Sequence, residues 1–300
     1  MRRALMIIIR RIILLVVVWH YSSSSEVLGC LNTPSKEQSL NGLSSEGHLL
    51  YYHLETSRNS RPSDKRNRLR PPSDPWDMAV DVILKGEYAT AIAQLEEIEA
   101  RDPGNYRTAS NLGTAFELAG ENEKALNWIR EGIKRNARAH RGTEWLHELI
   151  LEAKVAADRG VISESTTRLV AVPEQLSKDA LLTIRGVERK ASDVFDALAY
   201  QLEERMVFVK PKDRWVAECL FSLAVMQAHF YSIDDGLRIL SLSEKYGFPD
   251  EALLATTRKE WEWSSWLGEV KKWAAIVCGS VAGLAILILG IRKLRELLDA

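Results

Sequence analysis

An internal repeat constrains the fold of this chain more than any other feature. Small or apolar residues recur at a fixed separation of 34 positions: Gly86 and Gly120, Ala79 and Gly113, Ala91 and Ala125, Leu95 and Ile129. A period of this length is typical of arrays built from two-helix units. Small residues are expected where paired helices cross, with larger apolar residues filling the layer around them. The sequence therefore predicts stacked helix pairs, most clearly over residues 76–137.

These residues resemble the tetratricopeptide repeat (TPR) family. Two positions depart from the family pattern, because Met78 replaces a usual leucine and Ala137 stands where the first repeat has Pro103. The resemblance implies an all-α solenoid of antiparallel helix pairs. Two further stretches, GTEWLHELILEAK and ALAYQLEERMVFVKPKDRWVAECLF, are similar to TPR proteins of bacterial cell envelopes. That likeness covers residues 76–250, suggests a compartment and implies no chemistry.

Several residues mark expected helix starts. Ser73 or Asp74 can cap a helix that has Pro75 at its first position, where the missing N–H costs nothing. Ser192 and Asp213 are the expected caps of two later helices. Each has a side-chain oxygen that can accept a hydrogen bond from the first turn of the helix that follows.

The second half of the repeat region is less regular. A third unit begins at His140, and its second helix is interrupted by an irregular insertion at 159–178 that is rich in Gly, Ser and Thr. Helical patterning resumes at about Ser177. Ala224 and Gly236 lie 12 positions apart, as Gly113 and Ala125 do, so we expect a divergent fourth helix pair around them.

An apolar run near the carboxyl end predicts a transmembrane helix. Residues 274–291 carry no charge and one serine. At ~1.5 Å per residue they extend roughly 27 Å, about the thickness of a hydrocarbon core. Trp261, Trp263 and Trp266 precede the run, as an interfacial aromatic belt would. The spacing of Ala275, Gly279 and Gly283 is typical of close helix association in lipid, with a second copy or with another membrane protein.

The amino-terminal segment decides the expected orientation, because basic residues flank both ends of the apolar run at 274–291. Residues 1–29 begin with Arg2 and Arg3 and contain a short apolar run, which favours a secretory signal or an uncleaved anchor. Either would export the repeats, so we expect a single-pass protein of the bacterial inner membrane with an extracytoplasmic, periplasmic domain. If the segment is instead a cytosolic amphipathic start, the repeats face the cytoplasm.

No complete catalytic motif is present in the sequence. We find no phosphate-binding loop, no nucleophile elbow and no paired-cysteine metal motif, so we expect neither an enzyme nor a cofactor. The net charge of −1 gives no bulk attraction to nucleic acid. On a helix His140, Glu144 and His147 would share one face, which leaves a metal-dependent enzyme as an alternative. Leu151 occupies the position that a complete HExxH motif gives to histidine.

The resemblance implies a peptide-binding groove lined by the first helix of each repeat. A membrane-anchored scaffold for a protein or peptide partner is therefore the expected function. By repeat spacing, these residues would line the groove: Trp76, Val80, Arg107, Asn111, Thr114, Glu117, Arg141, Glu144 and Glu148.

The expected organisation has six parts in chain order. They are a signal or anchor at 1–29, a disordered basic linker at 30–71, TPR repeats at 72–158, the irregular insertion at 159–178, a divergent helical region at 179–266, and the transmembrane helix with a short basic tail at 267–300.

Overall fold

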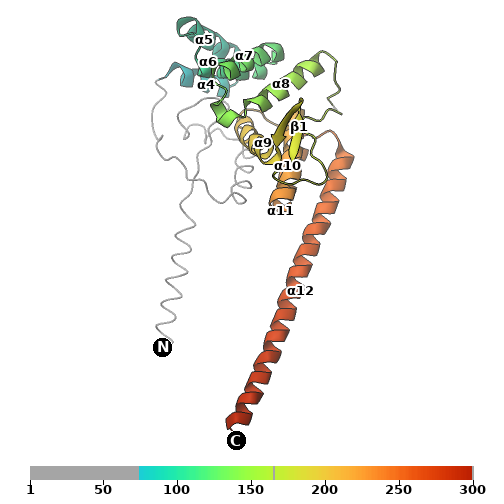
Figure 1. The fold of residues 1–300 in the computed structure, drawn as a ribbon. Coiled ribbons are helices and arrows are strands. Elements are labelled where there is room, and N and C mark those ends of the chain that lie inside the picture. Colours follow the sequence, from blue (N-terminus) through green and yellow to red (C-terminus); the bar gives the residue numbers. More distant parts are fainter. Residues whose placement is uncertain (1–73, 165, 299–300) are drawn as a thin grey trace.

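The computed structural model describes residues 74–164 and 166–298, with side chains described as far as residue 276. This part of the chain is mostly helical, and it contains nine α-helices and one small two-stranded hairpin (Figure 1). The elements are α4 (Pro75–Leu84), α5 (Tyr88–Arg101), α6 (Tyr106–Leu118), α7 (Asn122–Arg135), the short 3₁₀ helix η1 (Ala139–Gly142), α8 (Glu144–Asp158), β1 (Leu181–Ile184), β2 (Val187–Lys190), α9 (Ala191–Arg205), α10 (Arg214–Phe230), α11 (Ile233–Tyr246) and α12 (Glu251–Leu298).

Consecutive helices pack as adjacent pairs, which confirms the prediction of stacked helix pairs. Gly86 and Gly120 make the tight turns α4–α5 and α6–α7 with φ of 83° and 80°, a region that glycine reaches without strain. Gly113 lies where α6 crosses α7, because a Cβ there would stand 2.6 Å from the Ile129 Cγ1. Gly236 plays a similar part between α10 and α11, 3.1 Å from the Ala224 carbonyl oxygen if a Cβ were added.

Two of the predicted helix caps are confirmed and one is wrong. The Asp74 carboxylate accepts a hydrogen bond from the Trp76 N–H at 2.9 Å, and the Asp213 carboxylate accepts one from the Val216 N–H at 2.8 Å. Ser192 does not cap α9, which begins at Ala191. The reason is that β2 runs directly into α9, so the N-cap is Lys190 and the helix begins two residues earlier than a cap at Ser192 would place it.

The hairpin corrects the prediction of an all-α fold. Residues 181–190 were expected to be helical, but β1 and β2 pair antiparallel with Ile184 opposite Val187. Arg185 and Gly186 form the two-residue turn with φ of 53° and 75°, the positive values that a type I′ turn requires. Leu182 and Ile184 are buried while their neighbours are exposed, so one face of the hairpin covers the core.

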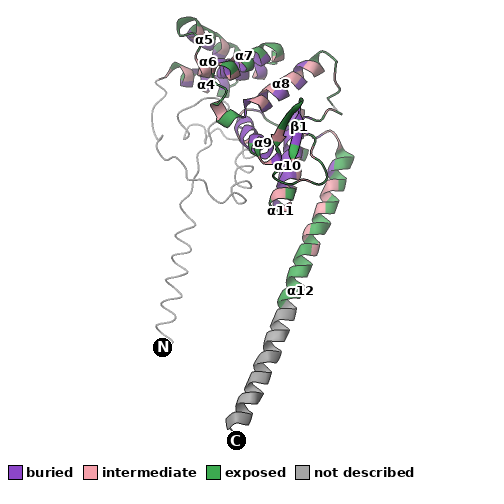
Figure 2. Cartoon of the chain, viewed as in Figure 1, coloured by how far each residue is buried: buried purple, intermediate pink, exposed green. Residues whose placement is uncertain are grey.

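Two hydrophobic cores meet at α8. The first, here called the N-terminal core, is built by α4 to α7 together with Leu151 and Val155 of α8. The second, the C-terminal core, takes Leu146 and Ile150 of α8 together with the hairpin and α9 to α12. Because one helix contributes to both cores, the described helices form a continuous body (Figure 2).

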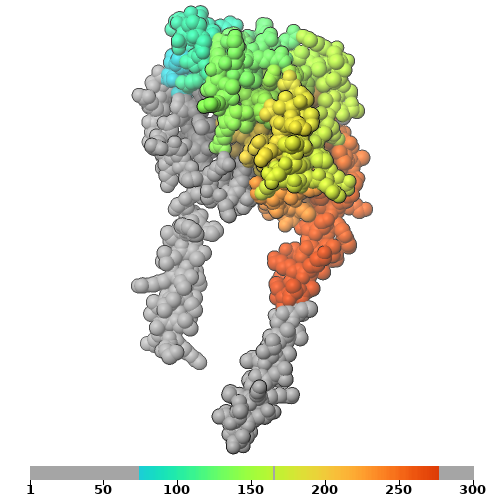
Figure 3. Space-filling view, in the orientation of Figure 1, coloured from blue at the N-terminus to red at the C-terminus, as the bar shows by residue number. Residues whose placement is uncertain are grey.

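Helix α12 begins on this body and then leaves it. Leu254 is buried, Trp261 packs near Gly236 of α11, and the Ser265 hydroxyl donates to Asp234 at 2.6 Å. Beyond Ser265 the described side chains of α12 are mostly exposed, and the helix stands clear of the body (Figure 3). Its 48 residues span about 72 Å at ~1.5 Å per residue.

Several predictions fall outside the described residues. They are the signal or anchor at 1–29 and the basic linker at 30–71. Gly279 and Gly283 of the proposed association motif lie on α12, but their surroundings are not described. The predicted span at 274–291 lies on α12, but the side chains after residue 276 are not described. Within the part that is described, no helix has both the length and the apolar character needed to cross a membrane.

Candidate functional site

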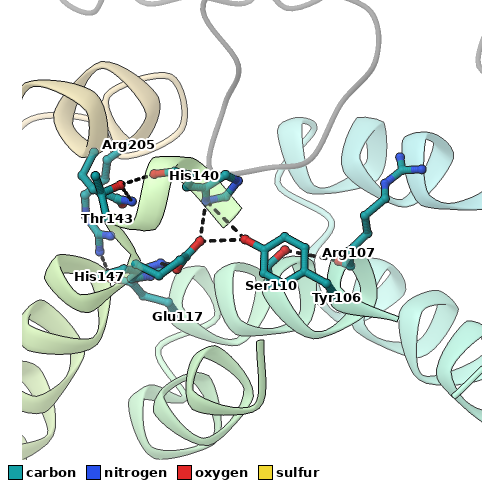
Figure 4. A network of polar contacts seen from close by, with 10 residues as sticks. Tyr106, Arg107, Ser110, Glu117, His140, Thr143, His147 and Arg205 are labelled. Atoms are coloured by element: carbon teal, nitrogen blue, oxygen red, sulfur yellow. Dashed lines mark hydrogen bonds and ion pairs between the residues drawn. The ribbon is translucent and has the colours of Figure 1, made fainter. Parts of the chain in front are cut away.

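A buried charged cluster joins α6, α8 and α9, and Glu117 lies at its centre (Figure 4). Three donors converge on this carboxylate. His147 Nε2 lies 2.8 Å from Oε2, Lys154 Nζ lies 2.7 Å from Oε1, and the Arg205 guanidinium forms an ion pair with the same Oε1. The side chains of Glu117, His147 and Arg205 are each only 1% exposed. Four side chains from three helices therefore share one buried site.

Glu144 makes the second centre of the same cluster. The Tyr106 hydroxyl donates to Glu144 Oε1 at 2.9 Å, and His140 Nδ1 contacts that oxygen as well. His140 was expected on the α8 helix, but it lies in η1 with φ of 46°, and α8 begins only at Glu144. Arg141 also has a positive φ, of 57°, so the chain reverses here before α8 starts. The prediction that His140 and Glu144 lie together is confirmed, although by a turn rather than by helical spacing.

Helix α9 packs against the cluster and contributes two side chains to its contacts. Gln201 donates to the Thr143 hydroxyl at 2.9 Å, and that hydroxyl donates to the His140 carbonyl oxygen at 2.6 Å. One turn later the same helix face carries Arg205 to Glu117. These contacts tie α9 to the start of α8 and to the end of α6.

Burial sets the ionisation of the cluster. It lowers the pKa of His147 to about 4, with a contribution from the charge of Lys154, and outweighs the opposing charge of Glu144. His147 is therefore neutral near pH 7 and donates its Nε2–H to Glu117, whose charge Lys154 and Arg205 already balance. Burial also raises the pKa of Glu204 well above its usual value, and the charge of Glu203 adds to that effect.

Glu144 behaves differently from Glu204. Burial alone would raise the pKa of Glu144, but the hydrogen bond and charge of His140, together with His147 and Tyr106, lower it. Glu144 is therefore an ionised carboxylate with partners, whereas Glu204 favours its neutral form. The Glu117 carboxylate thus pairs with two cations, and the cluster is buried except at Lys154, whose side chain is 14% exposed.

An open cleft of about 460 Å³ lies beside the cluster. It is bounded by the α6–α7 turn, α8, the start of α10 and the end of α11. Charged side chains of both signs line it: Glu117, Lys154, Asp158, Glu164, Lys212, Asp213 and Arg214. Lys154 bridges the two regions, because its ammonium lies 3.7 Å from Asp213 while it donates to Glu117. The cleft is thus the solvent-accessible edge of the buried cluster.

The structure divides the predicted groove residues into three groups. Val80, Asn111 and Thr114 are fully buried, and Glu117 and Glu144 belong to the cluster. Val80 is part of the N-terminal core. Glu117 and Glu144 are enclosed because α9, η1 and the start of α8 pack against the end of α6.

The remaining groove residues keep some exposed surface. Trp76 donates to Thr108 at 2.8 Å, and the Arg107 guanidinium lies 5.2 Å from its ring centre. Arg141 is exposed and lies over the Tyr200 ring. Glu148 lies one turn after Glu144 on α8 and pairs with Arg130 of α7 at 2.8 Å. Partner binding by these residues remains a prediction.

The alternative metal site has some of the expected geometry. His140 and His147 both approach Glu144, the second through Nδ1 at 3.8 Å from Oε2. Among the described residues, however, no three or more His, Cys, Asp or Glu side chains are grouped as metal ligands would be.

Sequence reasoning missed Arg205 and Lys154. A signal for Arg205 was present, since Val194, Leu198 and Arg205 follow the helical period of the buried face of α9. A charged residue on such a face indicates a buried partner. No pattern in the sequence identified that partner as Glu117, 88 positions away.

Comparison of the chain with protein-family models, with curated proteins and with solved structures finds no match. Similarity therefore assigns no family. The function proposed below rests on the sequence pattern and on the geometry of the site.

Proposed function

We propose that the protein is a membrane-anchored scaffold of TPR type, which holds a helix-pair body at the extracytoplasmic face and binds a segment of a protein partner. The spacing of helix ends supports the repeat type, because α4 and α6 end 34 positions apart, as do α5 and α7. The turn hydrogen bonds also correspond. Gly86 N–H donates to the Ile83 carbonyl oxygen and Gly120 N–H to that of Glu117.

The observation that carries the proposal is the course of α12. Its first four turns pack on α11, and the rest extends away from the body towards the apolar sequence at 274–291. A helix that leaves its own core loses the burial that normally stabilises it, unless another apolar environment receives it. A bilayer is the environment that the apolar sequence fits.

The cleft beside the cluster is the surface that we propose for the partner. The inner face of the first two helix pairs is closed at Asn111, Thr114 and Glu117, so a segment cannot lie along all of it. The cleft is open and is lined by Lys212 and Arg214 as well as by Asp158 and Asp213. A segment that carries charges of both signs complements such a lining.

In-cell photo-crosslinking tests the partner surface. A photoreactive residue in place of Asn122 or Lys212 is expected to trap one protein of defined mass, because both positions line the cleft. The matched control is Lys134, whose side chain is 80% exposed on α7 away from the cleft. If the Lys134 position traps the same species, or if the cleft positions trap none, the cleft is not the binding surface.

Topology is tested with a reporter fused after Ala300 together with alkaline extraction of membranes. The proposal expects a chain that stays with the membrane and a cytoplasmic reporter. An exported reporter would instead support the alternative of a cytoplasm-facing adaptor. A chain released by alkaline extraction would contradict the anchor.

The alternative of a metal-dependent enzyme rests on the approach of His140 and His147 to Glu144. Metal analysis of the purified full chain distinguishes it, with His147→Gln as the matched variant. Stoichiometric metal that is lost in the variant would favour the enzyme. The Glu117 carboxylate already has His147, Lys154 and Arg205 as partners, which favours the scaffold.

A further inference from the structure

A stripe of tryptophans lies exposed on α12 just beyond the body. The exposed fractions are 62% for Trp263, 54% for Trp266 and 61% for Trp273, and Val270 between them is 42% exposed. The rings of Trp263 and Trp266 stack with centroids 4.9 Å apart. Large exposed apolar patches of this kind mark sites of association. This tryptophan stripe is therefore a surface that needs a partner.

The tryptophan stripe faces away from the body. At ~100° per residue, its four positions fall within an arc of about 80° around the helix axis. The residues that hold α12 to α11, namely Leu254, Trp261 and Ser265, are centred about 140° away. The body therefore does not cover the tryptophan stripe, and the attachment of α12 to α11 leaves the stripe accessible.

A bilayer accounts for only one end of the stripe. On the proposed anchoring, with hydrocarbon starting at residue 274, Trp273 lies about 1.5 Å above that boundary along the axis. Trp266 lies about 12 Å and Trp263 about 16 Å above it. The interfacial layer is only about 5–8 Å deep on each side. Trp273 can sit in that layer, but Trp263 and Trp266 lie above it.

The spacing within the stripe is that of a coiled coil. Trp263 and Val270 are seven positions apart, and so are Trp266 and Trp273, which places them at successive a and d positions of a heptad. In the sequence the same register continues through 277, 280, 284, 287, 291, 294 and 298, where every residue except Ser280 is apolar. After the apolar run the neighbouring residues are charged, yet Leu294 and Leu298 still occupy positions of this heptad register.

The charges beside the stripe permit a parallel pair of identical helices. Glu262 and Glu269 occupy g positions, and the e positions they would face on another copy hold Leu267 and Ala274. No like charges oppose one another there. Anchoring in one membrane would also hold two copies parallel and at the same height. An in-register dimer needs both the absence of opposed like charges and two parallel helices at the same height.

We propose that a second copy of this chain covers the tryptophan stripe, so that two α12 helices pair in parallel through Trp263, Trp266, Val270 and Trp273. The exposed parts of three tryptophans supply on the order of 300–400 Å² per copy. Stable interfaces bury about 800 Å² per partner, and the continuing heptad register supplies the remaining area. The membrane step of this inference rests on the proposed function.

The GxxxG motif predicts a different pairing. Positions 275, 279 and 283 lie about 160° around the helix axis from the centre of the tryptophan stripe. One pair of straight helices cannot use both faces. Crosslinking can therefore decide between the two faces of α12.

The test is thiol crosslinking of the full chain in membranes, with Cys30 and Cys278 replaced by serine. Cys219 stays, because it is buried and burial raises the pKa of its thiol, which makes it unreactive. A short bis-maleimide is expected to link Val270→Cys into dimers. The matched controls Gly268→Cys and Lys271→Cys, at exposed positions off the stripe, are expected to remain monomeric.

A second variant shows whether the tryptophans drive the pairing. Trp263→Gln with Trp266→Gln in the Val270→Cys chain is expected to abolish the dimer without changing helix content, since both rings are exposed. A further variant, Ala275→Cys, reports on the small-residue face. The proposal is overturned if the tryptophan variant still crosslinks, if Val270→Cys gives no dimer, if Val270→Cys, Gly268→Cys and Lys271→Cys crosslink equally, or if only Ala275→Cys crosslinks. A chain found in the soluble fraction while Val270→Cys still crosslinks would remove the anchor and leave the dimer.

Discussion

Glu117 is the residue on which the buried cluster most depends. It receives three donors and has almost no exposed surface. Glu117→Gln keeps the shape but removes the negative charge that pairs with both Arg205 and Lys154. Removing one partner of a buried ion pair costs about 3–5 kcal/mol. We therefore expect a loss of that order in the free energy of unfolding, measured by urea denaturation.

The matched control for that measurement is Glu123→Gln. Glu123 pairs with Arg159 at 2.7 Å, but both side chains are more than 60% exposed. Exposed pairs contribute less than about 1 kcal/mol. If Glu117→Gln and Glu123→Gln lowered the free energy of unfolding equally, burial would not make the Glu117 ion pairs more stabilising than an exposed pair.

His147 gives the fold a dependence on pH. Its pKa is about 4 in the folded chain against 6.5 for the free side chain, so between those values only the unfolded chain binds the proton. Stability is therefore complete above pH 6.5 and falls as the pH drops towards 4, by about 1.4 kcal/mol per pH unit. His147→Gln should flatten this part of the curve, measured by denaturation between pH 7.5 and 4.5.

Glu204 has the opposite dependence, because its raised pKa means that the folded chain keeps a proton that the unfolded chain loses as the pH rises above 4.5. That effect is common to wild type and His147→Gln. It cancels when the two stabilities are subtracted at each pH. If the difference in free energy of unfolding between wild type and His147→Gln did not change with pH, His147 would not be the source of the pH dependence.

At the scale of elements, the helix crossing at Gly113 is open to a direct test. Gly113→Ala would place a Cβ against the buried Ile129 side chain, 2.6 Å from Cγ1 and 3.2 Å from the backbone nitrogen. Overpacking of this kind costs about 1–3 kcal/mol, more than the ~1 kcal/mol of helix propensity that alanine adds. We expect a lower melting temperature, measured by circular dichroism.

Gly268→Ala is the control for the crossing. Gly268 is also helical, but nothing lies within 4 Å of its added Cβ. Alanine should therefore leave stability unchanged or raise it slightly. A loss as large as that of Gly113→Ala would mean that the close approach of α6 and α7 is not the cause.

The sequence predicted elements well where local spacing determines them. Gly86, Gly113 and Gly120 mark turns and a crossing that any two-helix unit of this period needs. The hairpin was missed because its strands are four residues long, too short for alternation to stand out from helical spacing. Arg185 and Gly186 were the usable signal, since a two-residue pair with glycine directly after a short apolar run is typical of a tight hairpin.

The site could be predicted only in part for a related reason. Repeat spacing predicted Asn111, Thr114 and Glu117 as groove residues, and the structure shows all three buried. The spacing carried no information on what packs against them. The covering residues Gln201 and Arg205 come from a helix that lies outside the clear repeats. Contacts over such sequence distances depend on tertiary packing, which local patterns do not encode.

For the whole molecule, α8 is expected to couple the two cores. Leu151 is fully buried in the N-terminal core, and its neighbours Leu146 and Ile150 are buried in the C-terminal core. Leu151→Ala should cost about 2–5 kcal/mol. Because α8 serves both cores, amide hydrogen exchange should become faster in α4–α7 and also in α9 and α10.

Met78→Ala is the surface control for this experiment, since Met78 is 55% exposed. It should change stability by no more than about 0.5 kcal/mol. Faster exchange confined to α4–α7 in Leu151→Ala would show instead that the two cores open independently.

The unbroken course of α12 has a mechanical consequence. Trp261 and Ser265 fix one face of this helix to α11, so any turn of the helix about its own axis turns the body by the same angle. In the proposed dimer, two-fold symmetry would place the two bodies on opposite sides of the paired helices. A partner with two binding segments would then meet two identical clefts at a fixed separation, and its avidity would depend on whether its own spacing matches. The part of α12 beyond Ser265 would therefore fix the orientation of each body around the helix axis as well as its distance from the membrane.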